Sequence, residues 1–148
     1  MPANLVKSPF TINKDATGAT WLSADLVSVA TWTDVLSYAV PLGTAIEVTP
    51  QNYHYGDYNA TDTTTTITAG RTRLLKQNAN GTNTRELWLG PNSIFGDISD
   101  VRRRPSVRVP VILNASQVLK VQIISAGTTL DSASSDYFVE CQQVYEEI

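Results

Sequence analysis

Residues 63–89 read TTTTITAGRTRLLK, then QNANGTN, then TRELWL, and this stretch decides the fold class. The run of threonines with Ile67 between them is typical of an extended strand, because β-branched residues fit a pleated sheet. Asn80 and Gly81 follow, and an Asn-Gly pair between two strand-like runs is the strongest short signal of a β-hairpin. Residues 84–89 supply the returning strand. The stretch therefore predicts two antiparallel strands joined by a tight turn.

The alternation of apolar and polar residues extends outward from this hairpin in both directions. It predicts further strands at residues 26–40, 44–49, 106–113, 117–125 and 136–145. One parity of each strand is expected to face the core: Leu36, Tyr38 and Val40; Val107, Val109, Val111 and Leu113; Leu119, Val121 and Ile123; Tyr137, Val139 and Cys141. Residues 51–62, 90–104 and 126–135 are interpreted as loops. A helix over residues 23–35 is the competing interpretation, but β-branched and aromatic residues dominate that segment.

The chain has 148 residues, which is the size of one average domain. Seven strands with turn signals between them predict an all-β fold, an antiparallel β-sandwich or a jelly-roll-like barrel. Residues 21–148 are expected to form this single β domain. Residues 1–20 follow no period and are punctuated by prolines, which favours an extended N-terminal arm. Leu5 and Phe10 would give such an arm apolar side chains to bury on a neighbouring subunit.

Composition excludes several classes of protein. With 42% hydrophobic residues and a net charge of −3, the chain is expected to fold rather than remain disordered. It has no apolar run of about 18 residues, so we expect no membrane span, and no secretory signal is recognised. The pI near 5.0 argues against direct nucleic-acid binding.

The scarcity of cysteine and histidine removes most metal and catalytic chemistry. Cys141 is the one cysteine and His54 the one histidine. An intramolecular disulfide, a zinc site of several cysteines and a two-histidine metal site are therefore excluded. His54, between Tyr53 and Tyr55, is interpreted as a packing or partner-contact residue, with a hydrolase using it as a base as the remote alternative. We expect no enzymatic activity, no catalytic residues and no cofactor.

Paired carboxylates are the remaining candidates for chemistry. Asp57 with Asp62, and Glu140 with the glutamates at 146 and 147, lack the context of a glycosidase. Asp97 and Asp100 could bind calcium with nearby carbonyl oxygens, but their spacing matches no EF-hand loop. Turn capping is the favoured interpretation, and no metal site is predicted.

Two surface features suggest partner binding. Arg102, Arg103 and Arg104 form the only basic cluster, which is either a solvated loop or a contact with an acidic protein surface. The tryptophans at 21, 32 and 88 could form a platform for a sugar. A carbohydrate- or receptor-binding β module of a phage tail or a cell surface is therefore the alternative function.

Three segments resemble a known family. Residues 38–48 (YAVPLGTAIEV), 118–124 (VLKVQII) and 136–139 (DYFV) are similar to small β-sandwich decoration, or cement, proteins of tailed-phage heads. The resemblance implies a structural virion protein, made in the host cytoplasm, that binds the outer capsid surface and stabilises the head. Its implied partners are the major capsid protein and further copies of itself, as a homodimer or homotrimer, with neither membrane nor nucleic acid bound. No site residues carry over, because the family offers no sharp motif here.

Overall fold

The chain folds into β-strands throughout the part described. The computed structural model describes residues 5–23, 29–52, 54–57, 69–89, 93–94, 107–125, 131–133 and 135–146. In these ranges there are eleven strands and no helix, and hence no helix capable of crossing a membrane. The absence of helix over the described part of residues 23–35 excludes the competing helical interpretation there.

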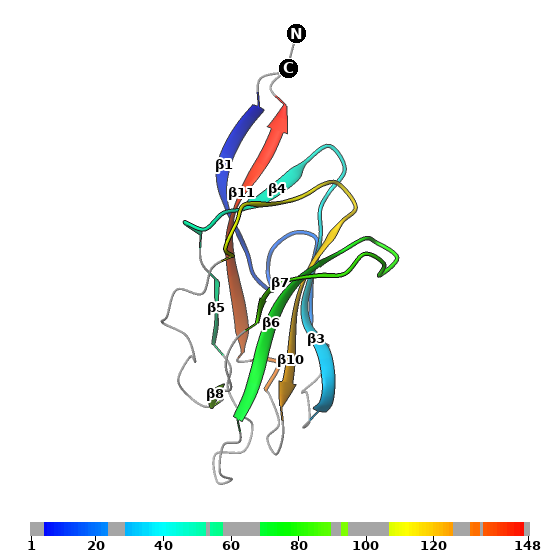
Figure 1. Ribbon diagram of the computed structural model, residues 1–148, viewed down its shortest axis with the longest axis vertical. Helices are drawn as coiled ribbons and strands as arrows, with labels where there is room; N and C mark the ends of the chain where they lie inside the picture. Colours follow the sequence, from blue (N-terminus) through cyan, green and yellow to red (C-terminus); the bar gives the residue numbers. More distant parts are fainter. Residues whose placement is uncertain are drawn as a thin grey trace.

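The strands form two antiparallel sheets that lie face to face (Figure 1). The first sheet has the order β1-β11-β4-β9, with β5 paired to β11 beside β4. Its strands are β1 (Leu5–Ile12), β4 (Ala45–Val48), β5 (His54–Asp57), β9 (Val111–Leu113) and β11 (Asp136–Glu146). The second sheet has the order β2-β3-β10-β6-β7, with β8 paired to β6. Its strands are β2 (Ala19–Trp21), β3 (Val29–Ala39), β6 (Ala69–Gln77), β7 (Arg85–Leu89), β8 (Ser93–Ile94) and β10 (Val118–Ser125). The predicted all-β sandwich is confirmed.

The core lies between the two sheets and uses the parities that the sequence predicts. Leu119, Val121 and Ile123 of β10 are buried in one apolar cluster with Tyr137, Val139 and Cys141 of β11. The same cluster takes Leu36 and Tyr38 from β3, followed by Val40. Burial of this apolar surface is the main favourable term in folding, so the cluster holds the two sheets together.

The predicted hairpin is present as β6 and β7. Arg73, Leu74 and Lys76 of β6 pair with Leu89, Trp88 and Arg85 of β7, with a bulge after Leu74. Gly81 has a φ of 80°, in the left-handed region that glycine adopts at no steric cost. Its amide donates to the Asn78 carbonyl at 2.9 Å, so the turn closes where the Asn-Gly pair predicts.

The strand predicted at residues 106–113 is shorter than expected. Only Val111–Leu113 pair, as β9, and Val109 is 51% exposed although Val107 and Val111 are buried. Proline lacks the amide hydrogen that a sheet ladder needs, which accounts for the break at Pro110. The prediction that Val109 faces the core is therefore wrong.

Two expected loops contain short strands. Residues 54–57, within the predicted loop 51–62, form β5 against β11, and residues 93–94, within the predicted loop 90–104, form β8 against β6. Both lie beside long strands, and pairing with a neighbour overrides the weak local propensity of their sequences. Residues 63–68 of the predicted strand lie outside the described residues.

The N-terminal segment is extended, as expected, but it belongs to the sandwich. All eight residues of β1 pair with β11, from Leu5 opposite Glu146 to Ile12 opposite Val139. Residues 19–21 form β2 on the edge of the second sheet. A separate arm is therefore wrong for these residues. Every second residue of β1 from Val6 onward is partly buried, and the last of these, Ile12, is fully buried. The prolines obscure this alternation in the sequence.

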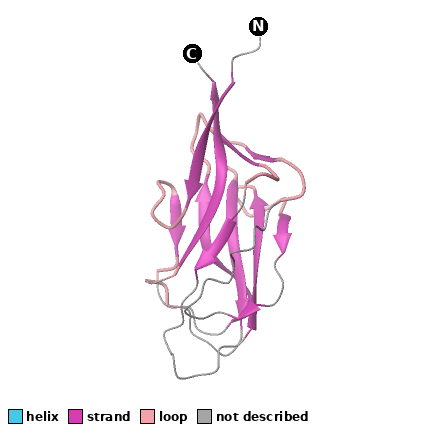
Figure 2. Cartoon of the chain, turned by 90° about the vertical axis from the view of Figure 1, so that its left-hand side faces the viewer, coloured by secondary structure: helices cyan, strands magenta, loops and turns pink. Residues whose placement is uncertain are grey.

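Beyond the core, β1 and β11 continue as a two-stranded ribbon toward the pole where both chain ends lie (Figures 1 and 2). The turn that follows the C-terminal end of β1 is hydrogen-bonded to the start of β11. Lys14 donates its amide to the Asp136 carboxylate at 3.1 Å and its ammonium group to the carbonyls of Ala133 and Ser135, each at 3.0 Å. The Trp21 indole donates to the Ser132 carbonyl at 2.9 Å. These bonds join the turn after β1, and β2 of the second sheet, to the segment that leads into β11.

Candidate functional site

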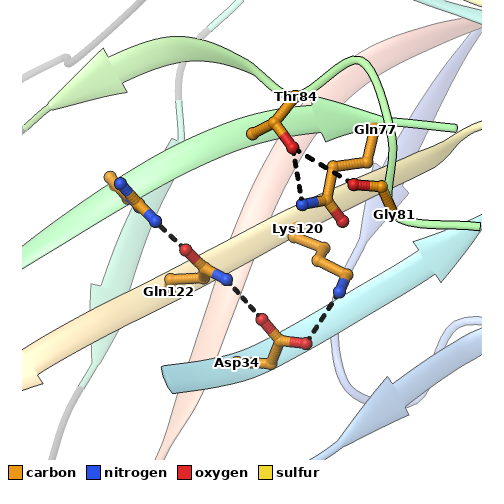
Figure 3. A network of polar contacts seen from close by, with 7 residues as sticks. Asp34, Gln77, Gly81, Thr84, Lys120 and Gln122 are labelled. Carbon is orange, nitrogen blue, oxygen red and sulfur yellow. Dashed lines mark hydrogen bonds and ion pairs between the residues drawn. The ribbon is translucent and has the colours of Figure 1, made fainter. Parts of the chain in front are cut away.

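A connected network of polar side chains lies on the outer face of the second sheet (Figure 3). Residues of β10 that alternate with the buried Leu119, Val121 and Ile123 point to this face, and two of them are Lys120 and Gln122. The Gln122 side chain accepts from Arg73 Nε at 2.8 Å and donates to Asp34 Oδ1 at 2.6 Å. Lys120 then pairs with Asp34 Oδ2 at 2.9 Å. One glutamine thus joins β6, β10 and β3 through their side chains.

Arg73 is held from two further directions. Its guanidinium carbon lies 4.4 Å from the centre of the Trp32 ring, which is cation–π geometry. One of its terminal nitrogens lies 3.7 Å from Glu86 of β7. We call Trp32, Asp34, Arg73, Glu86, Lys120 and Gln122 the outer network. Its charges satisfy one another, so the face is preorganised and suited to a polar contact with another macromolecule.

Sequence alone missed the outer network. The outward parity of residues 118–125 marks Lys120 and Gln122 as solvent-facing, and that signal was available. Their partners Asp34 and Arg73 are 88 and 49 positions away from Gln122 in the chain, and only the strand order brings them together.

The outer face of the first sheet is more apolar. Leu5 is 63% exposed on β1 and Ile112 is 47% exposed on β9. Between them, Lys7 and Glu47 form an ion pair at 3.1 Å. Because this pair neutralises its own charges, a partner could cover Lys7 and Glu47 without leaving either of them as an unpaired buried charge. Of the two predicted arm contacts, Leu5 is therefore available to a partner.

Phe10, the second predicted arm contact, is used within the chain. It is partly buried against the apolar cluster, with its ring centre 5.8 Å from that of Tyr38 on the opposite sheet. A side chain that contributes to its own core has little surface left for a partner, so the predicted contact role of Phe10 is not supported. Arg102, Arg103 and Arg104 lie outside the described residues, and their predicted role remains a prediction.

His54 lies deep between the sheets. It is 1% exposed, its Nδ1 meets the Tyr137 hydroxyl in a short hydrogen bond, and its ring stands edge-on to Trp88 with 4.6 Å between ring centres. Burial lowers the pKa of His54 to about 3. The imidazole is therefore neutral at pH 7 and has no access to a substrate in solution, so it is placed for packing rather than as a catalytic base.

Cys141, the one cysteine of the sequence, is also enclosed. Cys141 is a free, buried thiol whose pKa is raised to about 12 by burial, the opposite of a reactive cysteine. Among the residues described, no group of three or more His, Cys, Asp or Glu side chains could hold a metal ion. Asp97 and Asp100 fall outside those residues.

The three tryptophans do not form a shared platform. Trp21 is partly buried at the core and bonded to Ser132. Trp88 packs against His54 in the interior, and the Trp32 ring is covered by Arg73. The sugar-binding interpretation required their faces to be exposed together, and the fold separates them.

The described architecture is that of a small antiparallel β-sandwich of jelly-roll type. No protein-family model and no curated protein matches the sequence. Solved structures with the same fold do match. VP17, a capsid protein of bacteriophage P23-77, matches with a TM-score of 0.61 at 7% identity, over 99% of this chain and 100% of that one. A chain of the VP16-VP17 complex, a complex of the two major capsid proteins of the same phage, matches with a TM-score of 0.59 at 7% identity. That match covers 93% of this chain and 98% of the other.

At this low identity the likeness establishes a shared fold. These two structures are capsid proteins, not decoration proteins of tailed phages. The predicted resemblance to decoration proteins is therefore supported only in part: the chain shares its fold with capsid proteins, and the decoration role itself is not shown.

Proposed function

We propose that the chain is a structural protein of a viral capsid. The observation that carries the proposal is the agreement in fold with VP17 over essentially the full length of both chains, at a TM-score of 0.61. Agreement over whole chains means that the size of the domain and the order of its layers are shared, and not only one sheet. Fold alone does not define function, so the surfaces of the chain must also suit assembly.

The two outer faces suit such a role in different ways. One carries the outer network, a rigid polar surface, and the other carries exposed Leu5 and Ile112 around the neutral Lys7–Glu47 pair. A subunit in a shell contacts neighbours on several sides, and apolar centres with satisfied polar groups are typical of such interfaces. The buried positions of His54 and Cys141 support packing roles for both.

The more specific proposal is that the chain binds the outer surface of a capsid and reinforces it, as a dimer or trimer beside a major capsid protein. The VP16-VP17 complex contains two different capsid proteins, which supports a second capsid protein as the partner here. Arg102, Arg103 and Arg104 remain the proposed contact with acidic groups on that partner, together with Leu5. A shell-building subunit is the alternative position within the same virion.

Quantitative mass spectrometry of gradient-purified virions tests both levels of the proposal. We expect the chain to sediment with intact particles. Its copy number per particle should be one of the integer multiples that the symmetry of the capsid allows. A mild chaotrope wash separates the two positions: a reinforcing protein leaves an intact shell behind, whereas loss of a shell-building subunit dissolves the particle. Absence of the chain from gradient-purified virions before any chaotrope wash, together with binding on a glycan array, would refute the capsid role and support the sugar-binding alternative.

A further inference from the structure

His54 joins the two sheets at one point. It lies on β5 of the first sheet, and its ring meets Trp88 on β7 of the second sheet, with the ring planes at 80°. On its own sheet the ring lies 5.6 Å from that of Tyr137 on β11, centre to centre. β5, β7 and the adjoining part of β11 lie away from the pole that holds the chain ends (Figure 1). Contacts at His54 therefore help to hold the sheets together in that half of the sandwich.

The buried surroundings of His54 disfavour the protonated ring. A neutral imidazole has one N–H donor and one acceptor nitrogen, whereas the protonated ring has two donors. Nδ1 is bonded to the Tyr137 hydroxyl. Nε2 is buried and meets no hydrogen-bond partner among the described residues. Protonation would therefore place a positive charge and an unmet N–H donor in the interior, which is strongly unfavourable.

Among the described residues, no negatively charged group contacts the ring. The titratable group in contact with the His54 ring is the Tyr137 hydroxyl, and a phenol carries no negative charge in mild acid. On β11, Asp136 accepts from the backbone amides of Lys14 and Tyr137, and Glu140 alternates with the buried Val139 and Cys141 onto the outer face. On β7, Glu86 pairs with Arg73 in the outer network and Arg85 is exposed. Only the π face of Trp88 could favour a cation, and one aromatic ring compensates a small part of the lost hydration.

We propose that His54 is an acid-sensitive contact between the two sheets: its protonation separates β5 from β7 and loosens the packing of the sheets at that end. The neutral ring packs and bonds in place near pH 7. In mild acid the proton binds preferentially to conformations in which the His54 ring is exposed to water. The inference concerns the isolated chain and stands or falls independently of the proposed capsid role.

The direction of the pH dependence follows from the two states. The pKa of His54 is about 3 in the folded chain, against an ordinary value of 6.5 in the unfolded chain. Between these values the unfolded chain carries the proton and the folded chain does not, so stability falls as pH falls from 6.5 toward 3. This one group raises the unfolding equilibrium constant about tenfold per pH unit in that window, or about thirtyfold between pH 8 and pH 5.

Urea unfolding of the full chain at pH 8 and at pH 5 tests the proposal. The matched variant is His54→Asn, whose amide can replace Nδ1 in the bond to Tyr137 but does not titrate. Carboxylates contribute equally in both proteins, so the difference in pH dependence reports His54 alone. We expect the wild-type unfolding constant to rise about thirtyfold more than that of His54→Asn. Tyr137→Phe is the control: it should weaken the fold at both pH values and keep the pH dependence. Equal pH dependence in wild type and His54→Asn overturns the proposal.

Proton NMR of the wild-type chain gives a readout that does not depend on a variant folding. Because the sequence has a single histidine, its Cε1 proton signal needs no assignment by mutation. We expect no titration of this signal in the folded chain between pH 8 and pH 5, with an unfolded signal titrating near 6.5 in urea. A folded-state titration with a midpoint near 6.5 means that the ring is reached by water without loosening, and it overturns the proposal.

Discussion

Lys7 of β1 and Glu47 of β4 form an ion pair across β11, with 3.1 Å between the ammonium nitrogen and a carboxylate oxygen. Their strands do not pair with each other, since β11 lies between them and bonds to both. The pair therefore spans three strands of one sheet on its outer face. Each charge of the pair is neutralised by the other, which matters more for what can cover that part of the face than for the stability of the fold.

Lys7→Ala is expected to cost little stability. The Lys7 side chain is 48% exposed, and exposed ion pairs contribute about 0.2–1 kcal/mol. Urea unfolding at low and at high salt measures the cost. A double-mutant cycle of Lys7→Ala with Glu47→Gln should give a coupling energy of about 0.2–1 kcal/mol. A coupling energy of several kcal/mol would show that the pair is effectively buried and contradict this view of the face.

Gln122→Ala is expected to be more disruptive than a surface substitution. It removes the side chain that joins Arg73 to Asp34 in a largely buried position, and the loss is expected to be about 1–3 kcal/mol because two charged groups lose a partner. Lys120→Ala, which removes a partly exposed pair with the same Asp34, is the matched comparison. Thermal unfolding of both variants should rank Gln122→Ala as the less stable, and the reverse order would show that the outer network is not cooperative.

Cys141 is expected to be inert in the folded chain. Burial raises the pKa of its thiol to about 12, so the reactive thiolate is scarce at pH 8 and the reagent has no access. A chromogenic disulfide reagent should label less than a tenth of the protein over an hour in buffer and one thiol per chain in urea. Rapid labelling of the native chain would mean that β11 opens locally.

Gly43→Ala tests the turn between β3 and β4. Gly43 has a φ of 82°, and a Cβ built there meets nothing within 4 Å. The cost should therefore come from backbone conformation alone, about 1–2 kcal/mol. Gly43→Asn should cost less, because asparagine tolerates the left-handed region. Chemical denaturation of the two variants checks this order, and an equally stable alanine variant would contradict the turn geometry.

Leu5 and Phe10 separate assembly from folding. Leu5→Ser should leave unfolding unchanged, because the side chain is exposed, and should weaken association with the proposed capsid partner. Phe10→Ala should destabilise the chain, by less than the about 3–5 kcal/mol of a fully buried phenylalanine, because it packs on Tyr38. Denaturation combined with co-sedimentation checks both. If Leu5→Ser lowers stability as much as Phe10→Ala, the ribbon is part of the core and not a contact.

Each of the seven strands expected from the sequence overlaps a strand of the structure, although the one expected at residues 106–113 is reduced to Val111–Leu113 and residues 63–68 lie outside the described part. β1 was missed as part of the sandwich because Pro9 masks a period that only the pairing with β11 makes visible. β5 was missed because Tyr, Asn and Asp around it are typical of loops, and its stability comes from Val139 and neighbours on β11. The outer network and His54 were limited in the same way, because their surroundings come from other strands. Lys120 and Gln122 were recognisable as outward-facing, but their partners depend on strand order, and the burial of His54 depends on the opposite sheet.

The pairing of Leu5 with Glu146 places the first residue of β1 opposite the last residue of β11, at the pole where both ends of the chain emerge (Figure 2). A force that pulled the two ends apart would act across these strands and not along them. The bonds of the ribbon would then open one after another, as in a zipper, and never share the load. The sandwich is thus mechanically weak through its ends, so a shell that used it to resist internal pressure would have to transmit that tension through its faces.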